Sequence, residues 1–150
     1  MPDLITAELI RLDADLGGDK HAVIRSLATT VGEAGRAHDV DRVVADAWAR
    51  EETSATGLPG GIAIPHCRTV GIDEPALAFA RLSPGVDFGA ADGPADLVFL
   101  LVGTLGDDRH LRLLTQLARA LVKPAFTQAL REAASPTDAR DLVADTLGTL

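Results

Sequence analysis

The sequence predicts an α/β fold: a single domain with a central mixed β-sheet and helices on both faces. Apolar residues recur at helical spacing in the first and last thirds of the chain, whereas β-favouring runs occupy the middle. Helices that precede and follow a cluster of strands cover both faces of the sheet that the strands form. With 150 residues, 47% of them hydrophobic, residues 1–150 suffice for one continuous core and are expected to form one domain.

The first third predicts a short strand around residues 9–12 and then two helices. The first helix follows from apolar positions at helical spacing over residues 23–31, and Gly35 lies near its end. The same spacing over residues 40–48 predicts a second helix, which starts at Asp39 or Asp41 and ends near Arg50 and Glu51.

Turn and strand signals replace the helical spacing from residue 57 onward. Residues 57–61 contain three glycines and one proline and predict a turn, and residues 62–64 favour a strand that Pro65 ends. Two further strands are predicted over residues 77–82 and 86–88. Residues 97–102 are apolar without interruption, which is typical of a central strand covered on both faces.

Three helices are predicted in the last third of the chain. Their apolar stripes lie over residues 113–121, 126–133 and 139–146. Ser135 is a suitable cap for the last of them, and Pro136 is suited to its first turn.

The composition favours a cytoplasmic protein whose partners are proteins or small molecules. Acidic residues outnumber basic ones, 22 to 14, which disfavours binding to nucleic acid or to an anionic membrane. The chain has one cysteine, no signal-peptide pattern at its start and no apolar run of about 18 residues, so we expect neither disulfides nor insertion into a membrane. It also lacks the glycine-rich loops that bind nucleotides and the nucleophile elbow of α/β-hydrolases.

The four histidines are His21, His38, His66 and His110, and no two have the spacing of a metal-binding helix. We therefore expect no metal and no cofactor. His21 and His38 lie beside predicted helix starts, where exposed polar residues are ordinary. His66 differs, because it closes the segment GGIAIPHC, in which a proline interrupts a strand and places an imidazole at the sheet edge. Cys67 is expected to point to the opposite face and to act as a small buried residue.

His110 and Arg50 are weaker candidates on local sequence. His110 begins the leucine-rich helix, where free backbone N–H groups bind anions, but Asp107 and Asp108 oppose an anion unless they turn away as caps. Local sequence alone therefore favours an ordinary helix-start residue. Arg50, followed by Glu51, is likewise an ordinary helix-end cation on this basis.

Taken together, these segments resemble the enzyme IIA domain of the fructose and mannitol class of the bacterial phosphotransferase system (PTS), over nearly the whole chain. Arg50-Glu51 followed by residues 56–66, TGLPGGIAIPH, resembles the active-site signature of that family. Further blocks resemble the family in the expected order, namely residues 85–88, 92–93, 96–100 and 110–114.

The resemblance implies that His66 is phosphorylated, that His110 is the second active-site histidine, and that Arg50 helps to hold the phosphoryl group. It also implies a phosphotransferase that takes phosphate from the phosphocarrier HPr and passes it to a cysteine of a IIB domain, which can be joined to a IIC permease. Cys67, where a small residue is more usual, and the pair Asp107-Asp108 depart from the family pattern.

Three functions remain open at this point. The segment GVDFGAADGPADLVFLL resembles the fructose branch most and favours sugar uptake. The alternative is a regulatory protein of the nitrogen-related branch, whose phosphorylation state controls binding to other proteins. In the third, His66 is merely a residue at the end of a strand. The sequence does not identify the sugar.

Overall fold

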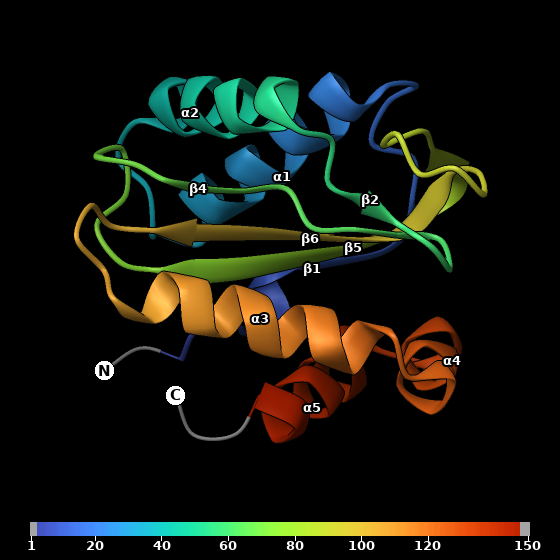
Figure 1. The fold of residues 1–150 in the computed structure, drawn as a ribbon. Coiled ribbons are helices and arrows are strands. Elements are labelled where there is room, and N and C mark those ends of the chain that lie inside the picture. Colours follow the sequence, from blue (N-terminus) through green and yellow to red (C-terminus); the bar gives the residue numbers. More distant parts are fainter. Residues whose placement is uncertain (1–2, 148–150) are drawn as a thin grey trace.

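A six-stranded mixed sheet runs through the middle of the computed structural model, which describes residues 3–147 (Figure 1). The strand order is β1-β5-β6-β3-β2, and β4 also pairs with β6. β5 and β6 are antiparallel, β1 is parallel to β5, and β3 and β4 are parallel to β6. The strands are β1 (Ile10–Ala14), β2 (Gly57–Leu58), β3 (Ile62–Ala63), β4 (His66–Arg68), β5 (Ala76–Val86) and β6 (Ala95–Gly103).

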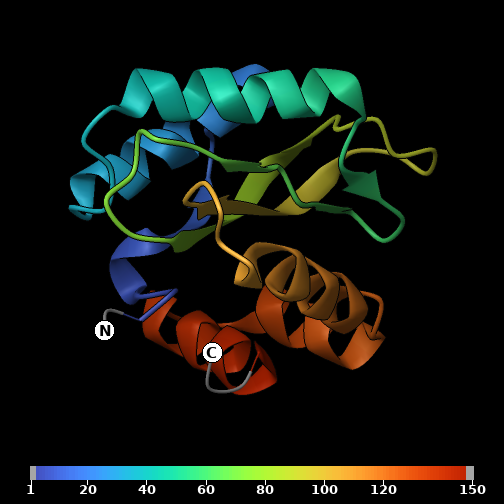
Figure 2. The same cartoon turned by 60° about the vertical axis from the view of Figure 1, so that its left-hand side comes forward.

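Helices cover both faces of this sheet, which confirms the predicted α/β architecture (Figures 1 and 2). On one face lie α1 (Lys20–Glu33) and α2 (Val40–Thr53). The other face is covered by α3 (Arg109–Leu121), α4 (Pro124–Glu132) and α5 (Pro136–Leu147), and a short 3-10 helix, η1 (Ala7–Leu9), precedes β1. No helix within residues 3–147 is long and apolar enough to cross a membrane.

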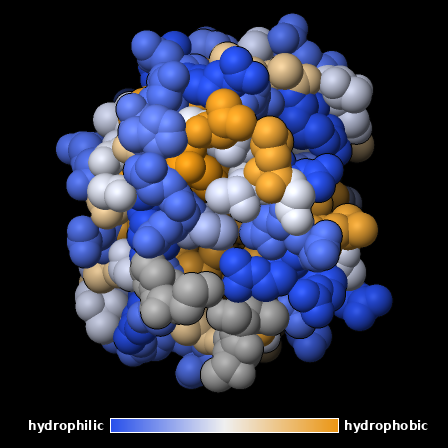
Figure 3. Space-filling model, turned by 90° about the vertical axis from the view of Figure 1, so that its left-hand side faces the viewer, coloured by the Kyte–Doolittle hydropathy of each residue, from blue (hydrophilic) through white to orange (hydrophobic). Residues whose placement is uncertain are grey.

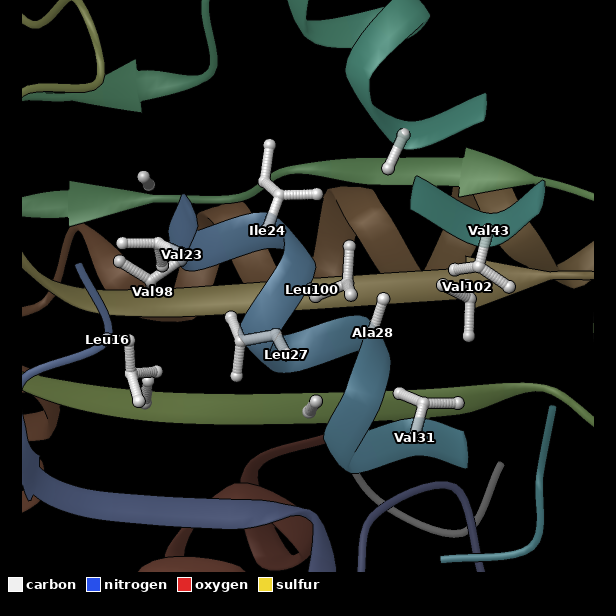
Figure 4. Packing of buried hydrophobic residues seen from close by; sticks show 14 of the residues in the cluster. Leu16, Val23, Ile24, Leu27, Ala28, Val31, Val43, Val98, Leu100 and Val102 are labelled. Atoms are coloured by element: carbon white, nitrogen blue, oxygen red, sulfur yellow. The ribbon is translucent and has the colours of Figure 1, made fainter. Parts of the chain in front are cut away.

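The residues of β6 divide between two hydrophobic cores, as expected of a central strand. Val98, Leu100 and Val102 belong to the core beneath α1 and α2. Figure 4 shows these three beside the inner face of α1 and Val43 of α2. The intervening residues of β6 belong to the core beneath α3 and α5. Burial of each leucine or valine side chain stabilises the folded state by about 1.5–3 kcal/mol, so β6 is held firmly in the middle of the domain. The loop that follows β6 therefore starts from a fixed position.

Helix ends follow the predicted caps, with one correction. The carboxylate of Asp39 accepts a hydrogen bond from the amide of Arg42 at 3.1 Å and caps α2, and the hydroxyl of Ser135 accepts one from the amide of Asp138 at 3.1 Å. α2 extends to Thr53, beyond the predicted end near Arg50 and Glu51. Both residues therefore lie inside its last turns, where the helix fixes their direction.

Two strand predictions are wrong in their details. β5 contains the predicted strand over residues 77–82 and continues to Val86, whereas residues 87–88 of the strand predicted over 86–88 lie outside it. The register of β5 is irregular between Arg81 and Val86, where pairing with β6 resumes. The predicted turn over residues 57–61 contains β2, which pairs with β3. Glycine and proline signal a turn locally, but pairing with a neighbouring strand outweighs that signal here.

Candidate active site

A pocket of about 870 Å³ opens at the end of the molecule where β4 and β6 finish. Its lining residues come from α2, from β4, from the loop between β6 and α3, and from the start of α3. Figure 2 shows how these elements are arranged, with α2 above, β4 in the middle and the loop below. Its lining includes three residues predicted from sequence, Arg50, His66 and His110, so the fold brings the predicted site together. The further lining residues are Asp46, Cys67, Arg68, Leu105, Gly106, Asp107, Asp108, Leu111 and Leu114.

His66 is the first residue of β4, and its position depends on the proline before it. β3 and β4 pair with successive parts of β6, and the carbonyl of Pro65 accepts the amide of Leu101 at 3.1 Å. The first strand thus ends before Pro65, as predicted, and a second strand, which the sequence did not predict, begins at His66. The pairing of His66 with Leu101 fixes the backbone from which the imidazole projects.

The imidazole of His66 has a defined tautomer. Its Nδ1 lies 2.8 Å from the carbonyl oxygen of Ile64. A carbonyl oxygen only accepts hydrogen bonds, so Nδ1 must carry the proton and donate it, which leaves the lone pair on Nε2. Nε2 is therefore the nucleophilic nitrogen of the ring.

The electrostatic environment keeps His66 neutral. Burial lowers the pKa of His66 below its ordinary value, and the charge of Arg50 lowers it further. The hydrogen bond to Ile64 and the charge of Glu51 raise that pKa by smaller amounts. Because the net shift is downward, the imidazole is uncharged at neutral pH and its lone pair is available.

His110 lies in the first turn of α3, with its ring centroid 5.8 Å from that of His66. Burial lowers its pKa, and repulsion from the protonated form of His66 and from Arg68 adds to this effect, whereas Asp107 raises it. Only 8% of His110 is exposed, and within residues 3–147 its Nδ1 is a buried polar atom without a hydrogen-bond partner. An unpartnered buried nitrogen is costly, so it indicates a group that is kept for a ligand or for catalysis.

Gly103, the last residue of β6, makes room for His110. A Cβ atom at this position would lie 2.7 Å from Nδ1 of His110, closer than real Cβ contacts occur. We expect Gly103→Ala to lower the free energy of unfolding by about 1–3 kcal/mol, because the His110 ring must shift inside a packed region. Denaturant unfolding measures this loss.

Gly18→Ala is the matched control for Gly103→Ala. Gly18 is exposed, and no atom lies within 4 Å of the position that its Cβ would take. Its variant should stay within about 0.5 kcal/mol of the parent. Equal stability of the two variants would contradict the packing role assigned to Gly103.

Arg50 reaches the pocket from the last turn of α2. Its Nη1 donates to the carbonyl of Ser54 at 3.1 Å, and within the described part of the chain its other nitrogens have no acceptor. The guanidinium therefore keeps donors free for an anion. Its charge already acts on His66, as the lowered pKa of that residue indicates.

Sequence reasoning missed Arg68 as a pocket residue. Side chains alternate along a strand, so Arg68 lies on the same face of β4 as His66, with Cys67 on the other. That two-residue spacing was the available signal. Cys67 is buried, which raises the pKa of its thiol to about 12 and confirms its predicted role as a small core residue.

The other polar residues considered in the sequence are Asp107, Asp108, His21 and His38. Asp107 turns toward the backbone and accepts the amide of Arg109 at 2.9 Å, whereas Asp108 stays exposed. His38 is exposed, as predicted, and bonds to Asp73. His21 is only partly exposed, because its ring packs against Trp48 with centroids 4.7 Å apart, which corrects the prediction. Neither His21 nor His38 lines the pocket.

The rim of the pocket is partly apolar. Leu105 and Leu111 expose 63% and 70% of their surface beside the two histidines, and Val70 exposes 55% in the loop after β4. Figure 3 views this end of the molecule and shows exposed apolar side chains surrounded by hydrophilic ones.

Comparison with known families agrees with this geometry. Residues 3–146 match the family described as phosphoenolpyruvate-dependent sugar phosphotransferase system, EIIA 2. This confirms the resemblance found in the sequence.

The relatives include both fructose-specific components and a nitrogen regulatory protein. The chain is 36% identical to the PTS system fructose-specific EIIA component of Haloferax volcanii, covering 92% of this chain and 90% of that protein. It is 37% identical to the nitrogen regulatory protein of Pseudomonas aeruginosa, covering 86% and 85%. A third relative, the PTS system fructose-specific EIIABC component of Bacillus subtilis, is 35% identical over 94% of this chain, which spans only 22% of that protein.

Solved structures show the same fold. The nitrogen regulatory protein IIA-Ntr of Neisseria meningitidis superposes with a TM-score of 0.85 at 28% identity, covering 94% of this chain and 97% of that one.

Proposed function

The chain belongs to the EIIA 2 family of the phosphoenolpyruvate-dependent sugar phosphotransferase system, and we propose that it carries a phosphoryl group on Nε2 of His66. The observation that supports this most is the hydrogen bond from Nδ1 of His66 to Ile64, at 2.8 Å. It holds the proton on the nitrogen that does not react. A neutral imidazole with its free lone pair beside an open pocket is a competent nucleophile.

The proposed transfer exchanges one phosphorus–nitrogen bond for another. The lone pair of Nε2 attacks the phosphorus of phosphohistidine on HPr, and the old bond breaks with its electron pair returning to the donor ring. In the onward step the thiolate of a IIB cysteine attacks, and the electron pair of the P–N bond returns to Nε2 of His66. Both steps depend on in-line positioning and on stabilising the charge of the phosphoryl oxygens.

Two groups of the pocket are suited to that stabilisation. Arg50 has guanidinium donors without a protein acceptor, and a guanidinium matches the spacing of phosphoryl oxygens. The ring of His110 lies close enough to His66 for its N–H to reach the same oxygens once a phosphoryl group is attached.

Arg50→Ala should slow phosphoryl transfer about tenfold or more without removing the acceptor, because a guanidinium stabilises charge but does not attack phosphorus. Rapid-quench measurement of phosphate transfer from phospho-HPr gives the rate. Arg42→Ala is the matched control, since Arg42 lies on the same helix but bonds to Asp46 and does not line the pocket. If the two variants were equally fast, Arg50 would be only a helix-end cation.

We place the carrier in sugar uptake, with fructose or a related sugar as the substrate of the complete transporter. The fructose-like segment of residues 85–101 supports this, as do two relatives that are named fructose-specific. The name EIIABC of the Bacillus relative supports IIB and IIC components as further partners. Such donors and acceptors place the transfer in the cytoplasm.

Nitrogen-type regulation is the second candidate, and the Pseudomonas and Neisseria proteins favour it. Both functions use His66, so the onward step distinguishes them. Incubation of the labelled phosphoprotein with a fructose IIB domain should move the label to the IIB cysteine. Retention of the label by a fully phosphorylated protein would favour regulation instead.

A further inference from the structure

We propose that Glu51 is a positioning residue, which holds the imidazole of His66 in its reactive tautomer through Thr56 and Ile64. The proposal rests on the proposed function of His66 as phosphoryl acceptor. Glu51 does not line the pocket, so it acts through the chain between α2 and β4 and not by touching the phosphoryl group.

A continuous series of hydrogen bonds connects the two residues. The carboxylate of Glu51 accepts the amide of Thr56 at 2.9 Å and its hydroxyl at 2.6 Å. The carbonyl of Thr56 accepts the amide of Ile64 at 3.3 Å. The carbonyl of Ile64 then accepts Nδ1–H of His66 at 2.8 Å. Thr56 is thus bonded to Glu51 and to Ile64, and Ile64 is bonded to Thr56 and to His66.

Glu51 is a buried charge that the proposed transfer chemistry does not use. It is only 1% exposed, and its Oε2 also lies 3.3 Å from Nζ of Lys20. Burying a carboxylate is costly unless it is fully hydrogen-bonded, and here two donors of Thr56 and one ammonium group satisfy it. Such a costly group indicates that the position of Thr56 is important.

The segment between Thr56 and His66 needs such an anchor. It contains two strands of two residues each, joined by a turn in which Gly60 and Gly61 both have positive φ. Pairing with β6 holds the chain at Ala63, and a bond to Leu101 holds it at Pro65, whereas Ile64 between them lies outside both strands. The hydrogen bond of the Ile64 amide to Thr56 therefore helps to orient the carbonyl of Ile64. That carbonyl alone selects Nδ1 as the protonated nitrogen of His66.

Two pairs of variants test this inference. Thr56→Val removes the hydroxyl that Glu51 holds, whereas Thr56→Ser keeps it. Glu51→Gln replaces one of the two acceptor oxygens by an NH₂ donor, so the side chain can no longer accept both the amide and the hydroxyl of Thr56, and it is the second disruptive variant. The readouts are the ¹⁵N shifts of the His66 ring in the unphosphorylated protein, which report its tautomer, and the rate of phosphoryl acceptance from HPr.

We expect Thr56→Val and Glu51→Gln to shift the His66 tautomer toward Nε2–H and to slow acceptance about tenfold, because small misplacements of a reacting group are costly. Thr56→Ser should match the parent in both readouts. If Thr56→Val folds and its ring shifts and rate equal those of the parent, Glu51 only anchors the fold and the proposal is wrong. If Glu51→Gln does not fold, the result for Thr56→Val alone decides whether Glu51 is a positioning residue. If the variants change the His66 tautomer but the parent protein itself never accepts phosphate, the proposed function is wrong and the positioning role of Glu51 stands.

Discussion

We expect the replacement of His66 with alanine to abolish phosphoryl acceptance from HPr and to leave the fold intact. The variant loses the only atom that forms the new bond with phosphorus, whereas β4 keeps its backbone pairing with β6. The loss of the hydrogen bond to Ile64 changes the free energy of unfolding by only about 1 kcal/mol. Incorporation of labelled phosphate and denaturant unfolding, measured on the same preparation, give both quantities.

His38→Ala is the control for His66→Ala. Its ring is exposed, bonds to Asp73 and lies outside the pocket, so its variant should accept phosphate at the parent rate. Acid-labile phosphate on a folded His66→Ala protein would contradict the assignment of His66.

Replacing His110 with alanine has the second largest effect. The variant should still accept phosphate at His66 but pass it to a IIB cysteine about 100-fold more slowly, because the lost N–H donor matters most while charge builds on the transferring group. Rapid-quench measurement of both half-reactions separates the two steps. His21→Ala, which changes a ring packed on Trp48, should leave both rates unchanged.

The pKa of His110 gives an independent test of its place beside the phosphoryl group. In the unphosphorylated protein, burial lowers this pKa most, and repulsion from the protonated form of His66 and from Arg68 lowers it further. A phosphoryl group on His66 adds negative charge close by and favours the imidazolium form, so the pKa of His110 should rise on phosphorylation. Histidine NMR titration before and after phosphorylation measures the change. An unchanged pKa together with normal onward transfer would make His110 an ordinary helix-start residue.

The sequence predicted the parts of the fold that depend on long periodic signals. The unbroken apolar run of β6 and the apolar stripes of the helices depend on burial alone, and burial is encoded by local pattern. The continuation of β5 past Arg81 and the resumption of strand pairing after Pro65 depend on a partner strand distant in sequence. No local window contains that partner, so strand pairing at residues 57–58 and 66–68 was not predicted.

The site was predictable to a different degree for each residue. His66 has a distinctive local context, whereas His110 and Arg50 were identified only through the family resemblance. Arg68 was missed, although it has the same strand spacing as His66. The role of Glu51 depends on hydrogen bonds to Thr56 and on Lys20 from another helix, which no sequence pattern displays.

One measurement tests the central claim most directly. The protein is incubated with enzyme I, HPr and phosphoenolpyruvate, its intact mass is determined before and after acid treatment, and the modified nitrogen is identified by NMR of the histidine rings. We expect the mass of a single phosphoryl group, lost in acid, with the phosphorus bonded to Nε2 of His66. An unchanged mass under conditions in which HPr itself is phosphorylated, or a phosphoryl group on any other residue, would contradict the account.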